Sequence, residues 1–177
     1  MISPVRMNYK LRCAAIREKF NGHENLVGAE IGVQGGRMAT RMLGWKSLKD
    51  YWCIDPWRAY DGYEKYPESH AVFLHNFLNR AALFADRVRI LTLPSTVAAN
   101  IFKPETFDFV FIDGNHAYPS VGEDILAWGP LVKRDGWLCG HDYGRVGCEG
   151  VKMAVDEIFP TQVELGPDYT WFVQRKG

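Results

Sequence analysis

The chain lacks several features that mark large classes of proteins. Its 21 Lys and Arg residues are matched by 21 Asp and Glu residues, so it has no surplus of positive charge. Binding to a phosphate backbone needs such a surplus, and nucleic acid is therefore not expected as the main partner. No apolar run is long enough to cross a membrane, and the N-terminus has no apolar signal-peptide core.

Cysteine is scarce as well. The four cysteines stand at positions 13, 53, 139 and 148, and no pair has Cys-x-x-Cys spacing. Neither a zinc knuckle nor a redox motif is therefore indicated. Cys53 and Cys139 fall in predicted strands, where a free cysteine behaves as a small hydrophobic residue. We expect a protein of the reducing cytoplasm.

Repeats, low-complexity segments and linkers are also missing, and 177 residues suit a single domain, 1–177. The 47% hydrophobic content can fill its core. The first twenty residues carry five basic side chains and one acidic one, Glu18, which is typical of a solvated face on an N-terminal helix. The basic residues are Arg6, Lys10, Arg12, Arg17 and Lys19.

What the chain does contain is an alternation of strand and helix patterns. This alternation predicts an α/β protein with a doubly wound, Rossmann-like and mostly parallel sheet of seven strands, with helices on both faces. The two last strands flank Gly166-Pro167-Asp168, a spacing that permits a hairpin and makes the last strand antiparallel. The predicted strands are 26–33, 51–54, 88–93, 107–112, 136–140, 162–165 and 169–174. The predicted helices are 8–20, 36–43, 68–84, 121–132 and 151–159.

The most apolar predicted strand, 107–112, stops abruptly at Asp113-Gly114-Asn115-His116. A strand that is apolar on both faces belongs inside a sheet covered by helices. Ligands bind at the carboxyl ends of the strands in such sheets. We therefore expect a carboxylate, an amide and an imidazole at the place where chemistry would occur.

A glycine-rich loop follows the first strand, with the sequence Glu30-Ile31-Gly32-Val33-Gln34-Gly35-Gly36. It lacks the Gly-x-Gly-x-x-Gly spacing of dinucleotide-binding proteins. A carboxylate at Glu30 also suits an ammonium or sulfonium group better than a pyrophosphate. Asp55 ends the second strand 23 residues after Gly32, where acidic residues grip a ribose. The two signals together favour a ribose-bearing cofactor over a tight turn and an Asp-Pro turn.

Four motifs, in register along the chain, closely resemble class I S-adenosylmethionine-dependent methyltransferases. Within that class the chain resembles the small-molecule O-methyltransferase group called methyltransferase domain 24, whose relatives include macrocin-type sugar O-methyltransferases. The resemblance covers about residues 24–176 and implies S-adenosylmethionine as cofactor and a hydroxyl as acceptor. The motifs are Glu30-Ile31-Gly32-Val33-x-x-Gly36, Asp55, Phe111-Ile112-Asp113-Gly114-x-His116-x-Tyr118 and Gly136-Trp137-x-x-x-His141-Asp142-Tyr143.

The resemblance also implies roles for the residues of the two first motifs. Glu30, Gly32 and Gly36 would border the methionine part of the cofactor. Asp55 would hold the ribose, and Trp57 would flank the adenine.

Two further parts of the chain take their roles from the same resemblance. Ser95 matches a serine that the family often carries after strand three, although Pro94 stands where an acidic residue is common. Residues 1–23 would form a helix that covers the active site. A homodimer is suggested by analogy alone.

Asp113 and Asp142 end neighbouring strands in this fold, so their like charges would need a cation or a shared proton. By the resemblance, the candidate ligands of a divalent ion are Asp113, His141 and Asp142. His141 replaces a common aspartate, and imidazole suits manganese, iron or zinc better than magnesium. In the alternative reading, Asp142 begins a turn before Gly144 and Asp113 only touches the cofactor.

His116 and His141 are the candidate bases. Methyl transfer to oxygen is an in-line displacement in which the hydroxyl loses a proton, and an imidazole near neutrality suits that task. A bound metal could acidify the hydroxyl instead, and then no base would be needed.

The acceptor side is less defined. Aromatic residues crowd residues 57–67, and the spacing of Tyr60, Tyr63 and Tyr66 favours a short packed helix over a lid. We expect a small-molecule acceptor in a pocket built from the N-terminal helix, this segment and the 143–150 loop, or from a partner subunit.

Three other functions compete with methyl transfer. A nicotinamide-dependent oxidoreductase is disfavoured by the glycine spacing and by Glu30. A cofactor-binding protein without catalysis stays open. A nucleic-acid methyltransferase is disfavoured by the neutral charge and by the absence of an Asn-Pro-Pro-Tyr or Asp-Pro-Pro-Tyr segment after strand four.

Overall fold

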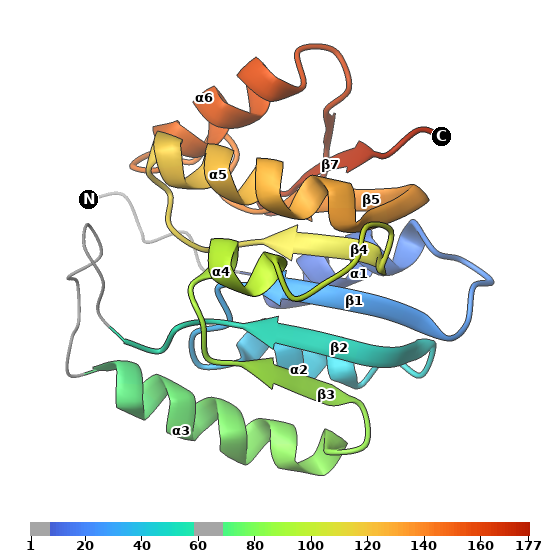
Figure 1. Cartoon of the computed structure of the whole chain (residues 1–177), viewed down its shortest axis with the longest axis vertical. Helices are drawn as coiled ribbons and strands as arrows, with labels where there is room; N and C mark the ends of the chain where they lie inside the picture. Colours follow the sequence, from blue (N-terminus) through green and yellow to red (C-terminus); the bar gives the residue numbers. More distant parts are fainter. Residues whose placement is uncertain (1–7, 59–68) are drawn as a thin grey trace.

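The computed structural model describes residues 8–58 and 69–177. Its centre is a seven-stranded sheet with the order β3-β2-β1-β4-β5-β7-β6 (Figure 1). The strands therefore begin in the middle of the sheet with β1, run outward to β3 and return to the centre with β4. They continue through β5 to β6 at the other edge, and β7 lies between β5 and β6. The strands are β1 (Leu26–Ile31), β2 (Leu48–Ile54), β3 (Val88–Leu91), β4 (Phe107–Ile112), β5 (Val132–Gly140), β6 (Glu164–Leu165) and β7 (Trp171–Gln174).

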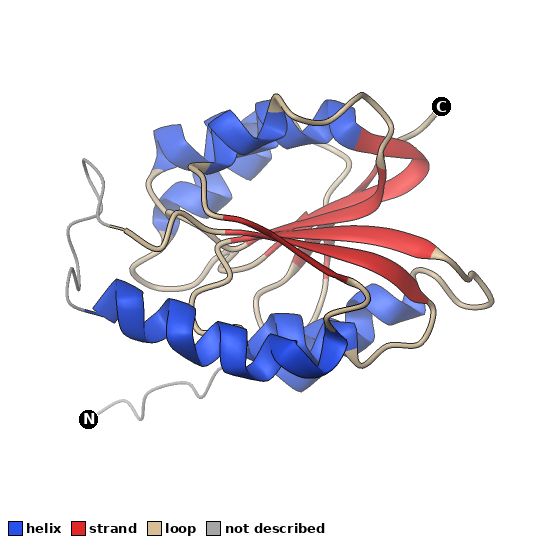
Figure 2. Cartoon of the chain, turned by 60° about the horizontal axis from the view of Figure 1, so that its bottom comes forward, coloured by secondary structure: helices blue, strands red, loops and turns tan. Residues whose placement is uncertain are grey.

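The sheet lies between two layers of helices (Figure 2). One layer packs with the core that contains residues of α1, α2 and α3, and the other packs with residues of α4, α5 and α6. This is the doubly wound arrangement that the alternating pattern predicts. The helices are α1 (Tyr9–Glu18), α2 (Arg37–Leu43), α3 (Ser69–Ala81), α4 (Ser95–Ala99), α5 (Tyr118–Trp128) and α6 (Glu149–Ile158).

Strand directions also follow the prediction. The pairs β1–β2, β1–β4, β2–β3 and β4–β5 are parallel, whereas β7 runs antiparallel to both β5 and β6. The predicted closing hairpin is therefore present, and β7 is the antiparallel strand of a mixed sheet. The fold is that of a Rossmann-like protein.

β4 shows why its sequence is so apolar. Phe109 and Phe111 belong to one core, and Val110 and Ile112 belong to the other, so both faces of the strand are covered. All four side chains are at most 4% exposed. A central parallel strand with this burial needs the uninterrupted apolar run that the sequence contains.

Most element boundaries differ from the predicted ones by a few residues, and one helix was not predicted. β5 begins at Val132 rather than Gly136, because the Arg-Asp-Gly turn is absorbed into the strand with Asp135 at a left-handed φ of 61°. α5 begins at Tyr118, three residues before the predicted start. α4 was not predicted, since its five residues are too few to show a helical period. Tyr60, Tyr63 and Tyr66 lie outside the described residues.

In the two described stretches, 8–58 and 69–177, none of the helices combines the length and apolar character that crossing a membrane requires.

Candidate active site

The carboxyl ends of three strands are held in register by backbone hydrogen bonds. The amide of Asp113 donates to the carbonyl of Ile31 at 2.8 Å, and the amide of His141 donates to the carbonyl of Ile112 at 3.0 Å. These bonds place the ends of β1, β4 and β5 side by side. The glycine turn, Asp113 and His141 therefore meet at one edge of the sheet, as the topology predicts.

The glycine turn touches the polar strand ends directly. Gly32 has a φ of +88°, and a Cβ atom there would lie 2.2 Å from the carbonyl oxygen of Asp113. Only glycine combines this left-handed φ with the absence of a Cβ atom. Gly36 has a φ of +72°, and its missing Cβ would meet the ring of Phe77 at 2.3 Å, just before α2 begins. The first turn after β1 is thus wedged between the β4 loop and α3.

Glu30 stands on β1, is 2% exposed, and accepts a hydrogen bond of 2.9 Å from the hydroxyl of Tyr51. Burial raises the pKa of Glu30 to about 8, although the Tyr51 hydroxyl opposes this rise. The free protein therefore holds Glu30 largely protonated at neutral pH. A cation bound beside it would favour the ionised form.

The Asp55 carboxylate accepts hydrogen bonds from neighbouring backbone amides. Its Oδ2 accepts from the amide of Gln34 and its Oδ1 from the amide of Trp57, each at 2.8 Å. Burial raises the pKa of Asp55 against the effect of these amides. The Trp57 ring is 7% exposed and stacks on Phe77, with ring centroids 5.3 Å apart. Roles for Asp55 at a ribose and for Trp57 at an adenine stay predictions.

Ser95 begins α4, and its hydroxyl donates to the carboxyl group of Asp124 on α5. Asp124 is 5% exposed, and burial raises its pKa to about 6. The sequence analysis missed Asp124. The signal was present, because Asp124 interrupts the apolar face that Val121 and Ile125 form on the same helix.

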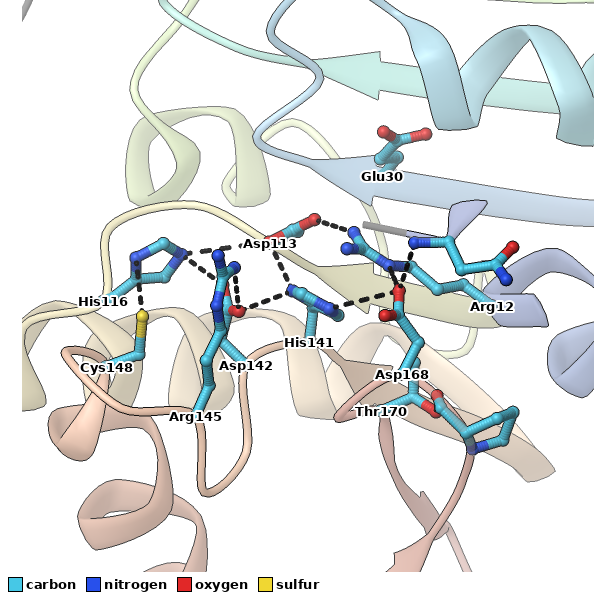
Figure 3. Close-up of polar contacts among 12 residues, drawn as sticks. Arg12, Glu30, Asp113, His116, His141, Asp142, Arg145, Cys148, Asp168 and Thr170 are labelled. Atoms are coloured by element: carbon cyan, nitrogen blue, oxygen red, sulfur yellow. Dashed lines mark hydrogen bonds and ion pairs between the residues drawn. The ribbon is translucent and has the colours of Figure 1, made fainter. Parts of the chain in front are cut away.

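Two histidines and two aspartates form the centre of the site (Figure 3). His116 Nε2 lies 2.9 Å from Asp142 Oδ2 and 3.9 Å from Asp113 Oδ1. His141 Nδ1 lies 2.9 Å from Asp142 Oδ1 and 3.5 Å from Asp113 Oδ1. Arg145 Nη1 donates to Asp142 Oδ1 at 2.8 Å. The structure therefore brings together four of the five polar residues that the sequence analysis places at the ends of β4 and β5. The fifth, Asn115, instead accepts a hydrogen bond from the amide of Ala117 at 2.9 Å.

The charged groups in this cluster shift one another's pKa values. The carboxylates of Asp113 and Asp142 raise the pKa of His116 to about 9, despite partial desolvation. Desolvation lowers the pKa of His141, but the same two carboxylates outweigh it and raise the pKa overall. Burial of Asp113 and Asp142 is outweighed in turn by hydrogen bonds from His116 and His141, which lower both carboxyl pKa values. The free protein therefore holds His116 as an imidazolium beside the Asp142 carboxylate near neutral pH.

Arg12 corrects the expectation of a solvated basic face on the N-terminal helix. It is 0% exposed, and its Nη1 lies 3.0 Å from Asp113 Oδ2 while its Nε lies 2.6 Å from Asp168 Oδ2. Asp168 also accepts from the amide of Asn8 at 3.0 Å and lies 3.7 Å from His141 Nε2. Residues 8–18 are thereby tied across the site to the turn before β7 (Figure 3).

The predicted metal ligands lie close enough to share an ion. One ligand atom each from Asp113, His141 and Asp142 lies within 4.8 Å of the others. Both ring nitrogens of His141 are buried beside carboxylates, with Nδ1 2.9 Å from Asp142 Oδ1 and Nε2 3.7 Å from Asp168 Oδ2, so an ion bound at Nδ1 would replace the contact with Asp142. Arg12 on Asp113 and Arg145 on Asp142 already supply positive charge, so an ion here would share the carboxylates with guanidinium groups.

A hollow of about 300 Å³ lies beside this cluster, between the loop after β5 and α6. Arg145 belongs both to its lining and to the cluster. None of the predicted cofactor residues lines it, so it is no substitute for a cofactor cleft. It is lined by Gly144, Arg145, Val146, Glu149, Lys152, Met153 and Asp156.

Comparison with known proteins gives one family. A family model described as a methyltransferase domain matches residues 29–143, which run from β1 to the residue after Asp142. No curated protein sequence matches the chain.

Solved structures with the same fold are distant in sequence. The O-methyltransferase NovP has 21% identity and a TM-score of 0.66, with 94% of this chain and 80% of that chain covered. An O-methyltransferase from Bacillus cereus in complex with SAH has 19% identity and a TM-score of 0.64, with 99% and 83% covered. A protein from Corynebacterium glutamicum has 18% identity and a TM-score of 0.67, again with 99% and 83% covered. At these identities the likeness establishes the fold alone.

Proposed function

Since the chain belongs to the methyltransferase-domain family, we propose that it transfers a methyl group from S-adenosylmethionine to a hydroxyl of a small molecule. One observation carries this proposal. The glycine turn at Gly32 touches Asp113, so a cofactor lying on that turn would have His116 and His141 at its methyl end. Proton-accepting groups beside a methyl donor suit attack by a hydroxyl oxygen.

The fold neighbours support the choice of acceptor atom. Two of them are O-methyltransferases, and the Bacillus cereus enzyme is described in complex with SAH, the product left when the cofactor has given up its methyl group. The family supplies the methyl-transfer chemistry. The protein's task is then to align oxygen, methyl and sulfur and to handle one proton.

His116 is the better placed of the two candidate bases. Its side chain is 39% exposed, whereas that of His141 is 1% exposed and enclosed by Asp113, Asp142 and Asp168. A base must reach the acceptor hydroxyl, and a buried ring cannot. Because the pKa of His116 is raised to about 9, it carries a proton at neutral pH and must lose it before it can accept another. The positive charge of the bound cofactor would favour that loss.

A divalent ion is part of the proposal. Asp113, His141 and Asp142 would hold it, and the close spacing of their ligand atoms fits that role. The ion would acidify the acceptor hydroxyl and orient its oxygen. His141 makes manganese a better match than magnesium. Arg12 and Asp168 would keep Asp113 and His141 in place.

Calorimetry with S-adenosylhomocysteine tests the cofactor first. We expect saturable binding, and no heat of binding at millimolar ligand would refute the proposal. A panel of phenols, sugars and other hydroxylated small molecules, with labelled S-adenosylmethionine, then tests catalysis. The Asp113→Ala, Asp142→Ala double variant should lose turnover. Unchanged cofactor affinity in this variant, with no turnover by the wild type on any acceptor, would favour a cofactor-binding protein without catalysis.

The ion is tested separately. Methyl transfer should stop in EDTA and return on addition of manganese or magnesium. Activity that is indifferent to the chelator would remove the metal from the proposal and leave His116 as the route for the proton.

A further inference from the structure

A buried carboxylate with one unused oxygen lies under the loop that follows β4. Asp124 stands on α5 and is 5% exposed, and its Oδ1 accepts a hydrogen bond from the hydroxyl of Ser95, the first residue of α4. Within residues 8–58 and 69–177, no donor reaches the second oxygen, Oδ2. Buried polar groups are normally hydrogen-bonded, so this oxygen needs a donor from outside the described part of the chain.

Asp124 Oδ2 borders the edge of the sheet where the cofactor is proposed to lie. A Cβ atom at Gly114, the residue after Asp113, would lie 3.5 Å from this oxygen. A Cβ atom at Gly32 would in turn lie 2.8 Å from the Cα atom of Gly114. The glycine turn, the loop after β4 and the Asp124 carboxylate are therefore successive neighbours at the carboxyl ends of the strands.

We propose that Oδ2 of Asp124 accepts a hydrogen bond from the exocyclic amino group of the cofactor's adenine, and that Asp124 thereby selects a 6-aminopurine. The inference rests on the proposed function, because it places S-adenosylmethionine at this edge. Burial raises the pKa of Asp124 to about 6, so the carboxyl group is largely ionised at neutral pH and can only accept hydrogen bonds. It pairs with an amino group and repels the carbonyl oxygen that a 6-oxopurine carries at the same position.

The order of the strands places the base near Asp124. β1 lies between β2 and β4, and β3 lies beyond β2. In the proposed binding mode the ribose lies at Asp55 after β2, and the sulfur lies near Asp113 after β4. The ribose carries the sulfur arm and the base on different carbon atoms, so the base extends away from the sulfur. It would then lie between the ends of β3 and β4, where Ser95 and Gly114 flank Asp124 on the face of the sheet that α4 and α5 cover (Figure 1).

Ser95 is a positioning residue in this arrangement. Its hydroxyl donates to Oδ1 and so fixes the carboxylate with Oδ2 toward Gly114. The neighbouring buried residues of α5, Val121, Ile125 and Trp128, are apolar or aromatic, and a carboxylate among them carries a desolvation cost. A pair that only joined α4 to α5 would satisfy one oxygen and leave the other without a donor. A ligand amino group would satisfy both.

Calorimetry on the full-length protein compares two ligands, S-adenosylhomocysteine and S-inosylhomocysteine, which has a carbonyl oxygen in place of the amino group. We expect the wild type to bind the adenine ligand about 10–100-fold more tightly, because a hydrogen bond to a charged group contributes about this factor. In Asp124→Asn this ratio of affinities should fall about tenfold or more, since the amide presents an NH₂ group that can donate to the carbonyl oxygen. A purely structural role of Asp124 would weaken both ligands alike and keep the ratio.

Glu123→Gln is the matched control. It makes the same exchange of a carboxylate for an amide on the same helix, but Glu123 is exposed, so the ratio should change by about twofold or less. Circular dichroism of each variant verifies folding. Equal affinity of the wild type for the two ligands would overturn the inference without any variant, and so would a ratio that survives Asp124→Asn. In both cases S-adenosylhomocysteine still binds and the proposed function stands, whereas no binding of either ligand would refute both.

Discussion

The two halves of the site are built in different ways. On the cofactor side, Asp55 accepts hydrogen bonds from the amides of Gln34 and Trp57, and Gly32 forms the turn that directly follows β1. On the polar side, Asp113 receives its charge partners from residues 101 positions earlier and 28 positions later, Arg12 and His141. The first half is a local backbone structure, and the second is an assembly of distant side chains. Mutations should therefore affect them through different mechanisms.

Removal of the buried cation should have the largest effect on stability. Arg12→Ala leaves Asp113 and Asp168 facing each other without Arg12, and breaking a buried ion pair typically costs about 3–5 kcal/mol. We expect a loss of this size in the free energy of unfolding, measured by urea denaturation at neutral pH. Equal stability of variant and wild type would show that the polar half does not rely on α1.

Lys10→Ala is the matched control for that measurement. Lys10 lies on the same helix but is exposed, so its removal should change the free energy of unfolding by about 0.5 kcal/mol or less. A loss in Lys10→Ala as large as in Arg12→Ala would show that the loss does not come from the buried ion pairs of Arg12.

The cofactor half should respond to volume instead of charge. Gly32→Ala places a Cβ 2.2 Å from the Asp113 carbonyl oxygen at a left-handed φ, so backbone strain adds to overpacking, for a total of about 2–4 kcal/mol. Gly22 has a similar φ of +80° with no atom within 4 Å, so Gly22→Ala should cost only about 1–2 kcal/mol. Thermal unfolding of both variants measures the stability lost through the steric clash at Gly32, as the difference between them. Equal losses of stability would disprove the clash.

This contrast explains what the sequence could predict. The strand β4, the glycine turn and Asp55 are each encoded within a few consecutive residues, so periodicity and turn chemistry find them. The convergence of Asp113, His116, His141 and Asp142 follows from one further step, the adjacency of parallel strand ends. Arg12 and Asp168 could not be found in this way, because their pairing joins residues 156 positions apart across a finished fold.

The same limit applies to Asp124 and Cys148. Asp124 could have been noticed as a polar residue on an apolar helix face, but its partner Ser95 is 29 residues away. Cys148 Sγ lies 3.6 Å from His116 Nδ1 although 32 residues separate them, and only the close contact between Gly150 and the loop after β4 brings them together. Local patterns identify residues that shape the backbone, whereas side-chain networks require the tertiary structure.

The polar half should also show its own pH dependence. The pKa of His116 is raised to about 9 in the folded protein, above an unfolded value of about 6.5. Its contribution to the free energy of unfolding is therefore complete below about pH 6.5 and is lost as the pH rises through about 9. The imidazole is 39% exposed, and solvent screening reduces the expected loss to about 1–2 kcal/mol.

The free energy of unfolding at a series of pH values tests this contribution. His116→Gln should flatten the decline between about pH 6.5 and 9 relative to the wild type. His75→Gln, which alters an exposed histidine beside Asn79 on α3, should keep the decline. Parallel curves for the wild type and His116→Gln would contradict the charge coupling to Asp113 and Asp142.

Asp55→Asn should give the smallest change in stability. The amide keeps one acceptor oxygen for the Gln34 or Trp57 amide and turns an NH₂ group toward the other, so one hydrogen bond is lost. Because a buried charge is removed as well, the net loss should be about 1 kcal/mol. The affinity for S-adenosylhomocysteine distinguishes this local structural role from the proposed contact with the ribose. If Asp55 also holds the ribose, calorimetry should show S-adenosylhomocysteine binding weakened by about tenfold or more, beyond the loss in stability. An unchanged affinity would confine Asp55 to shaping the turn, and the cofactor half would then rest on the backbone alone.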